Sequence, residues 1–151
     1  MRVPAPLVLA LSSLRKDYGF GAVPLAVFLA QSALETRSFD SASYRIGLNA
    51  FGMRRARVRP TPAVGDYLGH ARYLTVGDGV ADYLDRQRAY AIPNTSDPGR
   101  YIAATAASGY ATAPNYAAAW SGLLSKYSGA RWPVFPVPVV LLLGLTFASY
   151  D

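Results

Sequence analysis

The feature that most constrains the fold is the segment AVPLAVFLAQSALET at positions 22–36, which is apolar on nearly every side. A helix of this kind has no stripe suited to water, so it belongs at the centre of a domain. It is also short for a bilayer span, which needs about 20 residues. The sequence therefore predicts a buried central helix that other elements must surround.

The N-terminus allows two interpretations. An arginine followed by an apolar stretch resembles a secretion signal, but Pro4 and Pro6 interrupt that stretch and no small-x-small cleavage site follows. Leu7, Leu11 and Leu14 repeat at helical spacing instead. We therefore favour a first helix with one apolar face.

The rest of the chain predicts a mainly helical domain with one small hairpin. Its 151 residues suit a single domain, and 52% hydrophobic against 16% charged residues is too apolar for a disordered chain. The fold class is therefore α+β, mainly α, and we place the folded domain at 1–130. The expected elements are an irregular loop at 39–50, strands at 51–58 and 67–74, a helix from Thr75 or Asp78 to about Tyr90, a helix from Asp97-Pro98 to Gly109, and a helix over about 114–127.

Positive charge favours an anionic partner. Fifteen Lys and Arg against nine Asp and Glu leave a net charge of +6, which suits bacterial wall polymers, nucleic acid or anionic lipid. Arg54, Arg55, Arg57 and Arg59 form a cluster that is either a solvated hairpin edge or a polymer contact. Because neither a recognition-helix motif nor an RNP-type aromatic pattern is present, we expect no nucleic-acid partner.

Two residue counts exclude whole classes of site. The chain has no cysteine, so disulfides, thiol nucleophiles and cysteine metal sites are excluded, while the redox compartment stays undecided. The single histidine, His70, excludes a histidine-rich metal cluster and allows a Ser-His-Asp triad only if it is the base. A lone histidine in such a segment is more often a surface or packing residue. We expect no metal and no cofactor.

The C-terminal segment 131–151 differs in composition from the domain. Residues 132–150, WPVFPVPVVLLLGLTFASY, carry no charge and approach the length of a bilayer span, with aromatic residues at both ends. Three prolines weaken helix formation in its first third. A membrane anchor, a docking segment for a virion or other assembly, and a tail folded back on the domain are the three interpretations, in that order.

Four motifs occur in order along the chain, and together they are similar to one known family. They are LAQSALET at 29–36, NAFGM at 49–53, RYLTVGDGVADYL at 72–84 and GYATAPNYA at 109–117. The set resembles the bacterial and phage endo-β-N-acetylglucosaminidases, glycoside hydrolase family 73. This resemblance implies a lysozyme-like fold and cleavage of peptidoglycan strands between N-acetylglucosamine and N-acetylmuramic acid.

The resemblance implies that Glu35 is the catalytic acid, and elementary electrostatics supports it. Glu35 lies at the polar end of the apolar helix, where burial disfavours the charged carboxylate and raises its pKa. A protonated acid can then donate to a glycosidic oxygen. Gln31, one turn earlier, can orient the carboxyl or bind a substrate amide. The alternative is a helix-end carboxylate paired with Arg37.

The other motifs supply the remaining expected site residues. Asn49, Phe51 and Gly52 are expected to bind substrate, with Gly52 allowing close approach of backbone to a sugar. Tyr110 matches the family's active-site tyrosine, whose hydroxyl can hold a water or an acetamido group. Thr112 and Tyr116 complete the set of expected substrate-binding residues, with packing as the alternative for Tyr116.

Departures from the family pattern leave the reaction course open. The family's aspartate before proline is Ala113 here, so a helix cap is lost unless Thr112 replaces it. Asp66 is the best candidate for a second catalytic acid. Without it, the enzyme would rely on substrate assistance or release an anhydro-sugar, as lytic transglycosylases do. A non-catalytic wall-binding or virion module is the remaining alternative, and the expected location is the cell envelope, the periplasm or a phage particle.

Overall fold

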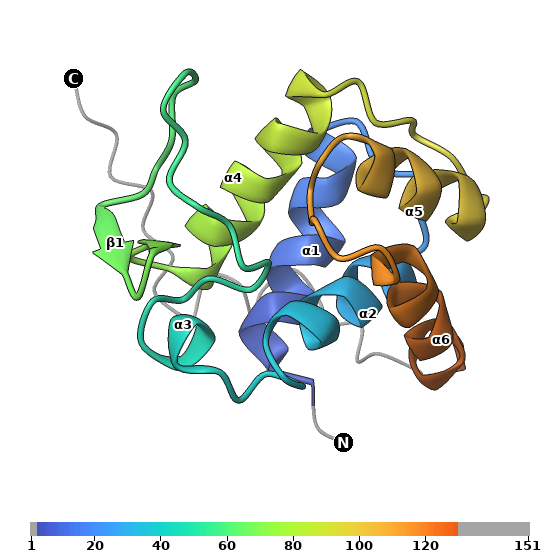
Figure 1. Ribbon diagram of the computed structural model, residues 1–151, viewed down its shortest axis with the longest axis horizontal. Helices are drawn as coiled ribbons and strands as arrows, with labels where there is room; N and C mark the ends of the chain where they lie inside the picture. Colours follow the sequence, from blue (N-terminus) through green and yellow to red (C-terminus); the bar gives the residue numbers. More distant parts are fainter. Residues whose placement is uncertain (1–2, 130–151) are drawn as a thin grey trace.

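The computed structural model describes residues 3–129 (Figure 1). The expected apolar tail at 131–151, with its predicted membrane or virion contact, lies outside the described residues. Within residues 3–129, no helix is both long and apolar enough to cross a bilayer. The described part is mainly helical with a single two-stranded sheet, as the sequence predicted.

The predicted central helix is α2, Leu25–Glu35, and it lies at the core of the domain. All seven residues at 27–33 are buried, including Gln31 and Ser32. It packs chiefly against α6, Tyr116–Ser128, while α1, Ala5–Asp17, packs chiefly against α4, Val76–Ala89. The indole of Trp120 on α6 donates a 2.9 Å hydrogen bond to the Val27 carbonyl, which fixes α6 on the central helix.

Two of the long helices begin at the capping residues that the sequence predicted. Thr75 and Asp78 form a capping box at the start of α4, and Asp97 accepts two backbone N–H bonds at the start of α5, Pro98–Ala107. By contrast, α6 begins at Tyr116 without a side-chain cap on its N-cap residue Asn115. Thr112 therefore does not replace the missing aspartate as a cap, because it lies three residues before the N-cap.

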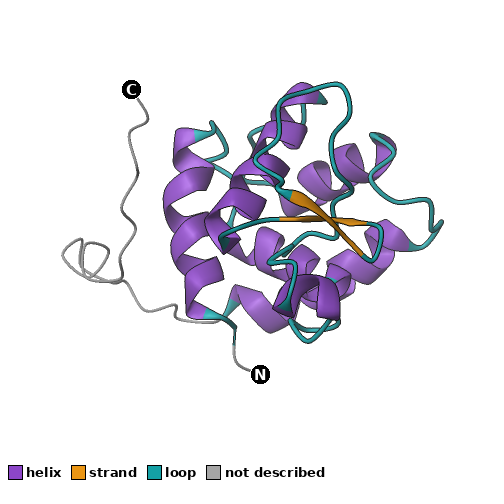
Figure 2. Ribbon diagram, turned by 90° about the vertical axis from the view of Figure 1, so that its left-hand side faces the viewer, coloured by secondary structure: helices purple, strands orange, loops and turns teal. Residues whose placement is uncertain are grey.

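Both predicted strands are wrong: residues 51–58 form no strand, and the predicted strand at 67–74 contains the turn between the two observed strands. The sheet pairs β1, Gly65–Tyr67, with β2, His70–Arg72, across the two-residue turn Leu68-Gly69 (Figure 2). Both turn residues have positive φ, 50° and 77°, which matches the twist that two-residue hairpins favour. Residues 54–64 form an arm that bends at 57–59, and its last residue, Val64, donates a 2.9 Å backbone bond to the Arg72 carbonyl of β2. A short helix, α3, Ala42–Arg45, lies in the expected loop.

Asn49 holds the segment before the arm against the hairpin. It is 1% exposed, and its amide nitrogen donates 2.8 Å bonds to the carbonyls of Met53 and Ala71. Its oxygen accepts from the backbone N–H groups of Phe51 and Met53. One side chain thus closes the turn at 49–53 and joins it to β2. This turn carries the Gly52 backbone, which the candidate site uses.

We predict that Asn49→Ala destabilises the domain. The substitution leaves buried backbone groups without partners, so we expect the free energy of unfolding to fall by about 2–4 kcal/mol. Urea denaturation followed by circular dichroism measures the change. Asn115→Ala is the matched control, because Asn115 is exposed and its side chain caps nothing. Equal stability of the two variants would contradict the role given to Asn49.

Candidate active site

Glu35 ends the central helix and lies directly beside the Gly52 backbone. A Cβ placed at position 52 would lie only 2.7 Å from Glu35 Oε2, and Gly52 has a φ of +63°. Both the space and the backbone conformation therefore require glycine here. Glu35 itself is half-buried. Oε2 of Glu35 consequently lies against the backbone at Gly52, where no side chain separates the two.

The other carboxyl oxygen is held by a tyrosine. Tyr116 donates a 2.6 Å hydrogen bond to Glu35 Oε1, and Gln31 Nε2 donates a 2.9 Å bond to the Tyr116 hydroxyl. The structure thus brings Gln31, Glu35 and Tyr116 together, three residues that the sequence named as site candidates. The alternative partner Arg37 is exposed, and the ion pairs among the described residues do not include Glu35.

These two bonds end a longer chain of hydrogen bonds through the core. Six links join seven side chains, with donor–acceptor distances from 2.5 to 2.9 Å. In order, the chain runs through Arg86, Gln87, Tyr101, Tyr83, Gln31, Tyr116 and Glu35. Its two interior glutamines are completely buried. Neither Gln87 nor Tyr83 was named as a site residue from the sequence.

The direction of every link follows from the two ends. Arg86 can only donate, so the oxygen of Gln87 faces it and the Gln87 amide nitrogen faces Tyr101. An ionised Glu35 can only accept, so Tyr116 must donate to it and receive from Gln31. All donors therefore point from Arg86 towards the Glu35 carboxyl.

Burial and hydrogen bonding act on the pKa of Glu35 in opposite directions. Burial raises the pKa above its usual value and is the largest effect. The Tyr116 hydrogen bond and the charge of His70 oppose it. His70 Nδ1 donates a 3.0 Å bond to the Gly52 carbonyl, which brings the imidazole to the site. The sequence favoured a surface or packing role for His70, and no pattern in the sequence indicated this position.

Tyr110 lies beside Tyr116 and seals the turn from the other side. Its hydroxyl donates to the Phe51 carbonyl, and its ring stacks on Tyr116 with centroids 6.0 Å apart. Phe51 is fully buried and stacks on Tyr83 at 3.9 Å. Asn49 is also buried, so both residues support the turn from beneath, and their burial does not favour direct contact with a substrate.

Asp66 and Thr112, two further predicted site residues, are exposed. Asp66 lies on β1 opposite Ala71, and it takes no part in the hydrogen bonds that the described residues make around Glu35. Thr112 lies in the connection between α5 and α6. The structure thus gathers Gln31, Tyr110 and Tyr116 around Glu35 and Gly52, and leaves these two outside that group.

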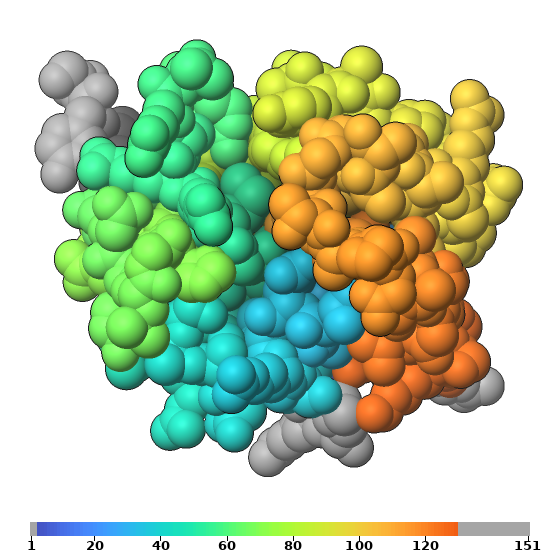
Figure 3. Space-filling model, viewed as in Figure 1, coloured from blue at the N-terminus to red at the C-terminus, as the bar shows by residue number. Residues whose placement is uncertain are grey.

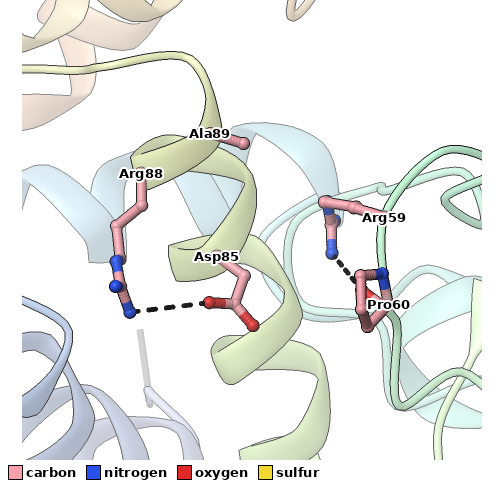
Figure 4. Close-up of a pocket in the computed structure, with 5 residues that line it drawn as sticks. All are labelled: Arg59, Pro60, Asp85, Arg88 and Ala89. Carbon is pink, nitrogen blue, oxygen red and sulfur yellow. Dashed lines mark hydrogen bonds and ion pairs between the residues drawn. The ribbon is translucent and has the colours of Figure 1, made fainter.

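A hollow of about 570 Å³ begins at Gly52 and Tyr110 and extends along the arm. It lies between the arm and the connection around residue 110, where the space-filling view is hollowed (Figure 3). Four arginines line it, namely Arg54, Arg57, Arg59 and Arg86. A shallower hollow adjoins it and shares Arg59 and Ala89; there Asp85 faces Arg88 (Figure 4).

Solved structures with the same fold come from several bacteria. A chain of a type VI secretion system effector–immunity complex from Pseudomonas protegens has a TM-score of 0.65 at 16% identity, covering 82% of this chain and 89% of that one. The truncated glycoside hydrolase domain of FlgJ from Salmonella typhimurium gives 0.61 at 23%, covering 84% and 96%. The catalytic domain of the autolysin Auto from Listeria monocytogenes gives 0.58 at 20%, covering 85% and 88%.

The family follows from the sequence. No curated protein matches the chain. The glucosaminidase family, described as mannosyl-glycoprotein endo-beta-N-acetylglucosaminidase, matches residues 12–129. This match spans most of the chain and contains every side chain of the network around Glu35. The chain therefore belongs to the glucosaminidase family and has its lysozyme-like glycoside hydrolase fold.

Proposed function

We propose that this protein cleaves peptidoglycan glycan strands between N-acetylglucosamine and N-acetylmuramic acid, with Glu35 as the general acid. The observation that carries the proposal is the Glu35 carboxyl itself. Burial raises its pKa, Tyr116 fixes one of its oxygens, and the other lies beside Gly52 where a hollow begins. Family membership and the fold shared with an autolysin and with the FlgJ glycoside hydrolase domain support the same substrate.

The hydrogen bond from Tyr116 selects which oxygen carries the proton. Because Tyr116 donates to Oε1, the acidic proton of the neutral carboxyl is placed on Oε2. Oε2 is the oxygen next to Gly52, and Gly52 lines the hollow, so we propose that the glycosidic oxygen approaches from this side. Protonation of that oxygen lets the leaving sugar depart while positive charge develops on the ring that remains.

The second step distinguishes hydrolysis from lytic transglycosylation. Two-carboxylate hydrolysis needs a second acid, and Asp66 is our candidate for that role. Asp66 is exposed on β1 and forms no described bond to the Glu35 network, which favours a reaction with one protein acid. Such a reaction would proceed by substrate assistance or by release of an anhydro-sugar. Either reaction acts on a polymer outside the cytoplasm, so we place the protein in the envelope or in a phage particle.

We predict that Glu35→Gln abolishes wall cleavage. Loss of a general acid typically costs about 100- to 10,000-fold in rate. Clearing of purified bacterial walls measures the rate, and Asp66→Asn is the matched carboxylate-to-amide comparison. Clearing by Glu35→Gln at the unmodified rate would reject the acid role. Mass spectrometry of the released sugar ends then separates reducing ends from anhydro-sugars.

We predict that the Glu35 carboxyl titrates above the usual glutamate range, and that Tyr116→Phe raises its pKa further. The substitution removes a hydrogen bond that stabilises the charged form. Glu35 is the only glutamate in the chain, so carboxyl-labelled glutamate gives a single ¹³C resonance to titrate. Tyr18→Phe, at the end of α1, should leave the titration unchanged. A lower pKa in Tyr116→Phe would contradict the assigned direction of the bond.

We also predict that Glu35→Gln stabilises the fold at neutral pH. With its folded-state pKa raised, Glu35 contributes stability below its unfolded pKa and loses that contribution as pH rises through the folded value. An amide carries no such penalty. Thermal melts should therefore favour Glu35→Gln at pH 7, with the difference shrinking towards pH 4. A difference that grew at low pH would show that the carboxylate is stabilising instead.

A further inference from the structure

We propose that the arginine-lined hollow beside Gly52 binds carboxylates of the peptide stems attached to the glycan. This inference rests on the proposed function, since it names the part of the substrate that occupies the hollow. The hollow and the Glu35 site share the Gly52 turn and Tyr110. A strand cleaved at Glu35 therefore brings the muramic acid next to the hollow, and that sugar carries the stem.

The charge of this hollow is not compensated by its own walls. Its lining includes four arginines and no carboxylate. Arg59 is the exception among them, because its guanidinium pairs with the buried carboxylate of Asp82. Arg54 and Arg57 are exposed and take part in none of the ion pairs that residues 3–129 form. An anion in the hollow would meet uncompensated positive charge.

The adjoining hollow shows the contrast. There Asp85 lies 3.9 Å from Arg88, so each charge has a partner within the wall (Figure 4). The two hollows share Arg59 and Ala89, and they differ in whether a carboxylate is present. The fold thus leaves positive charge unbalanced on the side that continues into the Glu35 site.

Arg86 gives the hollow a fixed inner wall. It is 9% exposed, and its guanidinium lies over the rings of Tyr90 and Tyr110, 4.1 and 4.7 Å from their centroids. Bonds to Gln87 Oε1 and the Ser108 carbonyl use two of its five N–H groups. A buried guanidinium without a carboxylate partner is costly, and it is held here in one orientation. A planar fork of this kind suits a carboxylate.

The arm that carries Arg54 and Arg57 is anchored near its middle, through Arg59. Asp82 on α4 accepts from Arg59 and, at 2.5 Å, from the Tyr73 hydroxyl. The two exposed arginines therefore extend from a fixed point over the hollow. Its volume of about 570 Å³ is within the range of specific ligand sites and exceeds what a single ion needs.

The test measures binding without turnover, in full-length protein carrying Glu35→Gln. Calorimetry compares two soluble glycan fragments of equal length, one with peptide stems and one whose stems an amidase has removed. The arginine variant adds Arg54→Gln and Arg57→Gln to this Glu35→Gln background. Lys16→Gln with Arg100→Gln is its control, because both residues are exposed, lie on α1 and α5, and carry the same total charge.

We expect the arginine variant to bind the stem-bearing fragment at least tenfold more weakly than the control does. The stem-free fragment should bind both variants equally, and added salt should reduce the difference. An equal loss of affinity for the stem-bearing fragment in the arginine variant and in its control would assign the effect to net charge and overturn the proposal. Equal affinity of the Glu35→Gln protein for the two fragments would also overturn it. Tighter binding of a glycerol-phosphate oligomer than of the stem-bearing fragment would also overturn it, in favour of wall phosphates.

This design separates the inference from the proposed function. A wild-type protein that fails to clear walls, while Glu35→Gln binds stems through the arginines, would remove the enzymatic proposal and keep the binding site. A protein that clears walls but binds both fragments equally would keep the enzyme and remove the stem site.

Discussion

The arrangement of this domain depends on one directed chain of hydrogen bonds that crosses its core from Arg86 to Glu35. A central helix as apolar as α2 would normally carry no polar side chain inward, yet Gln31 is fully buried within it. Burial of an amide is tolerated only when both of its ends have partners. Tyr83 and Tyr116 supply them, and each of these tyrosines comes from a different helix. The hydrogen-bond network thereby fixes α4 and α6 relative to Glu35, the proposed general acid.

This network of hydrogen bonds fixes which oxygen of Glu35 carries the proton, and the buried carboxyl lowers the stability of the fold when it is charged. A carboxyl with a raised pKa is less stable when charged, and the fold retains this penalty at Glu35. Rigid neighbours reduce the freedom of the carboxyl, because Tyr116 holds one oxygen and the Gly52 turn limits the other. The network also places polar groups where an apolar core would pack as well, which is a common trade between stability and function.

The sequence predicted the parts of this structure that depend on local patterns. The apolar helix and the caps at Thr75 and Asp97 depend on local patterns, and each lies where the sequence predicted it. The failures are long-range. Residues 51–58 form no strand, and the local pattern could not show this because their contacts are with β2, where Ala71 donates to the Met53 carbonyl. His70 lies at the site because the Leu68-Gly69 turn reverses the chain. The place of Gln87 in the hydrogen-bond network was not predictable from its own helix, because its partners Tyr101 and Thr105 lie on α5.

Arg86 is where the two functional features of the domain meet. The same guanidinium begins the hydrogen-bond chain that ends at Glu35 and forms the inner wall of the cationic hollow. Tyr110 has an equivalent double position, since its ring covers Arg86 on one side and stacks on Tyr116 on the other. A carboxylate bound in the hollow would therefore lie against groups that are rigidly connected to the acid. Binding of the stem and orientation of the scissile bond would then use one set of contacts, as expected when binding energy positions a substrate for reaction.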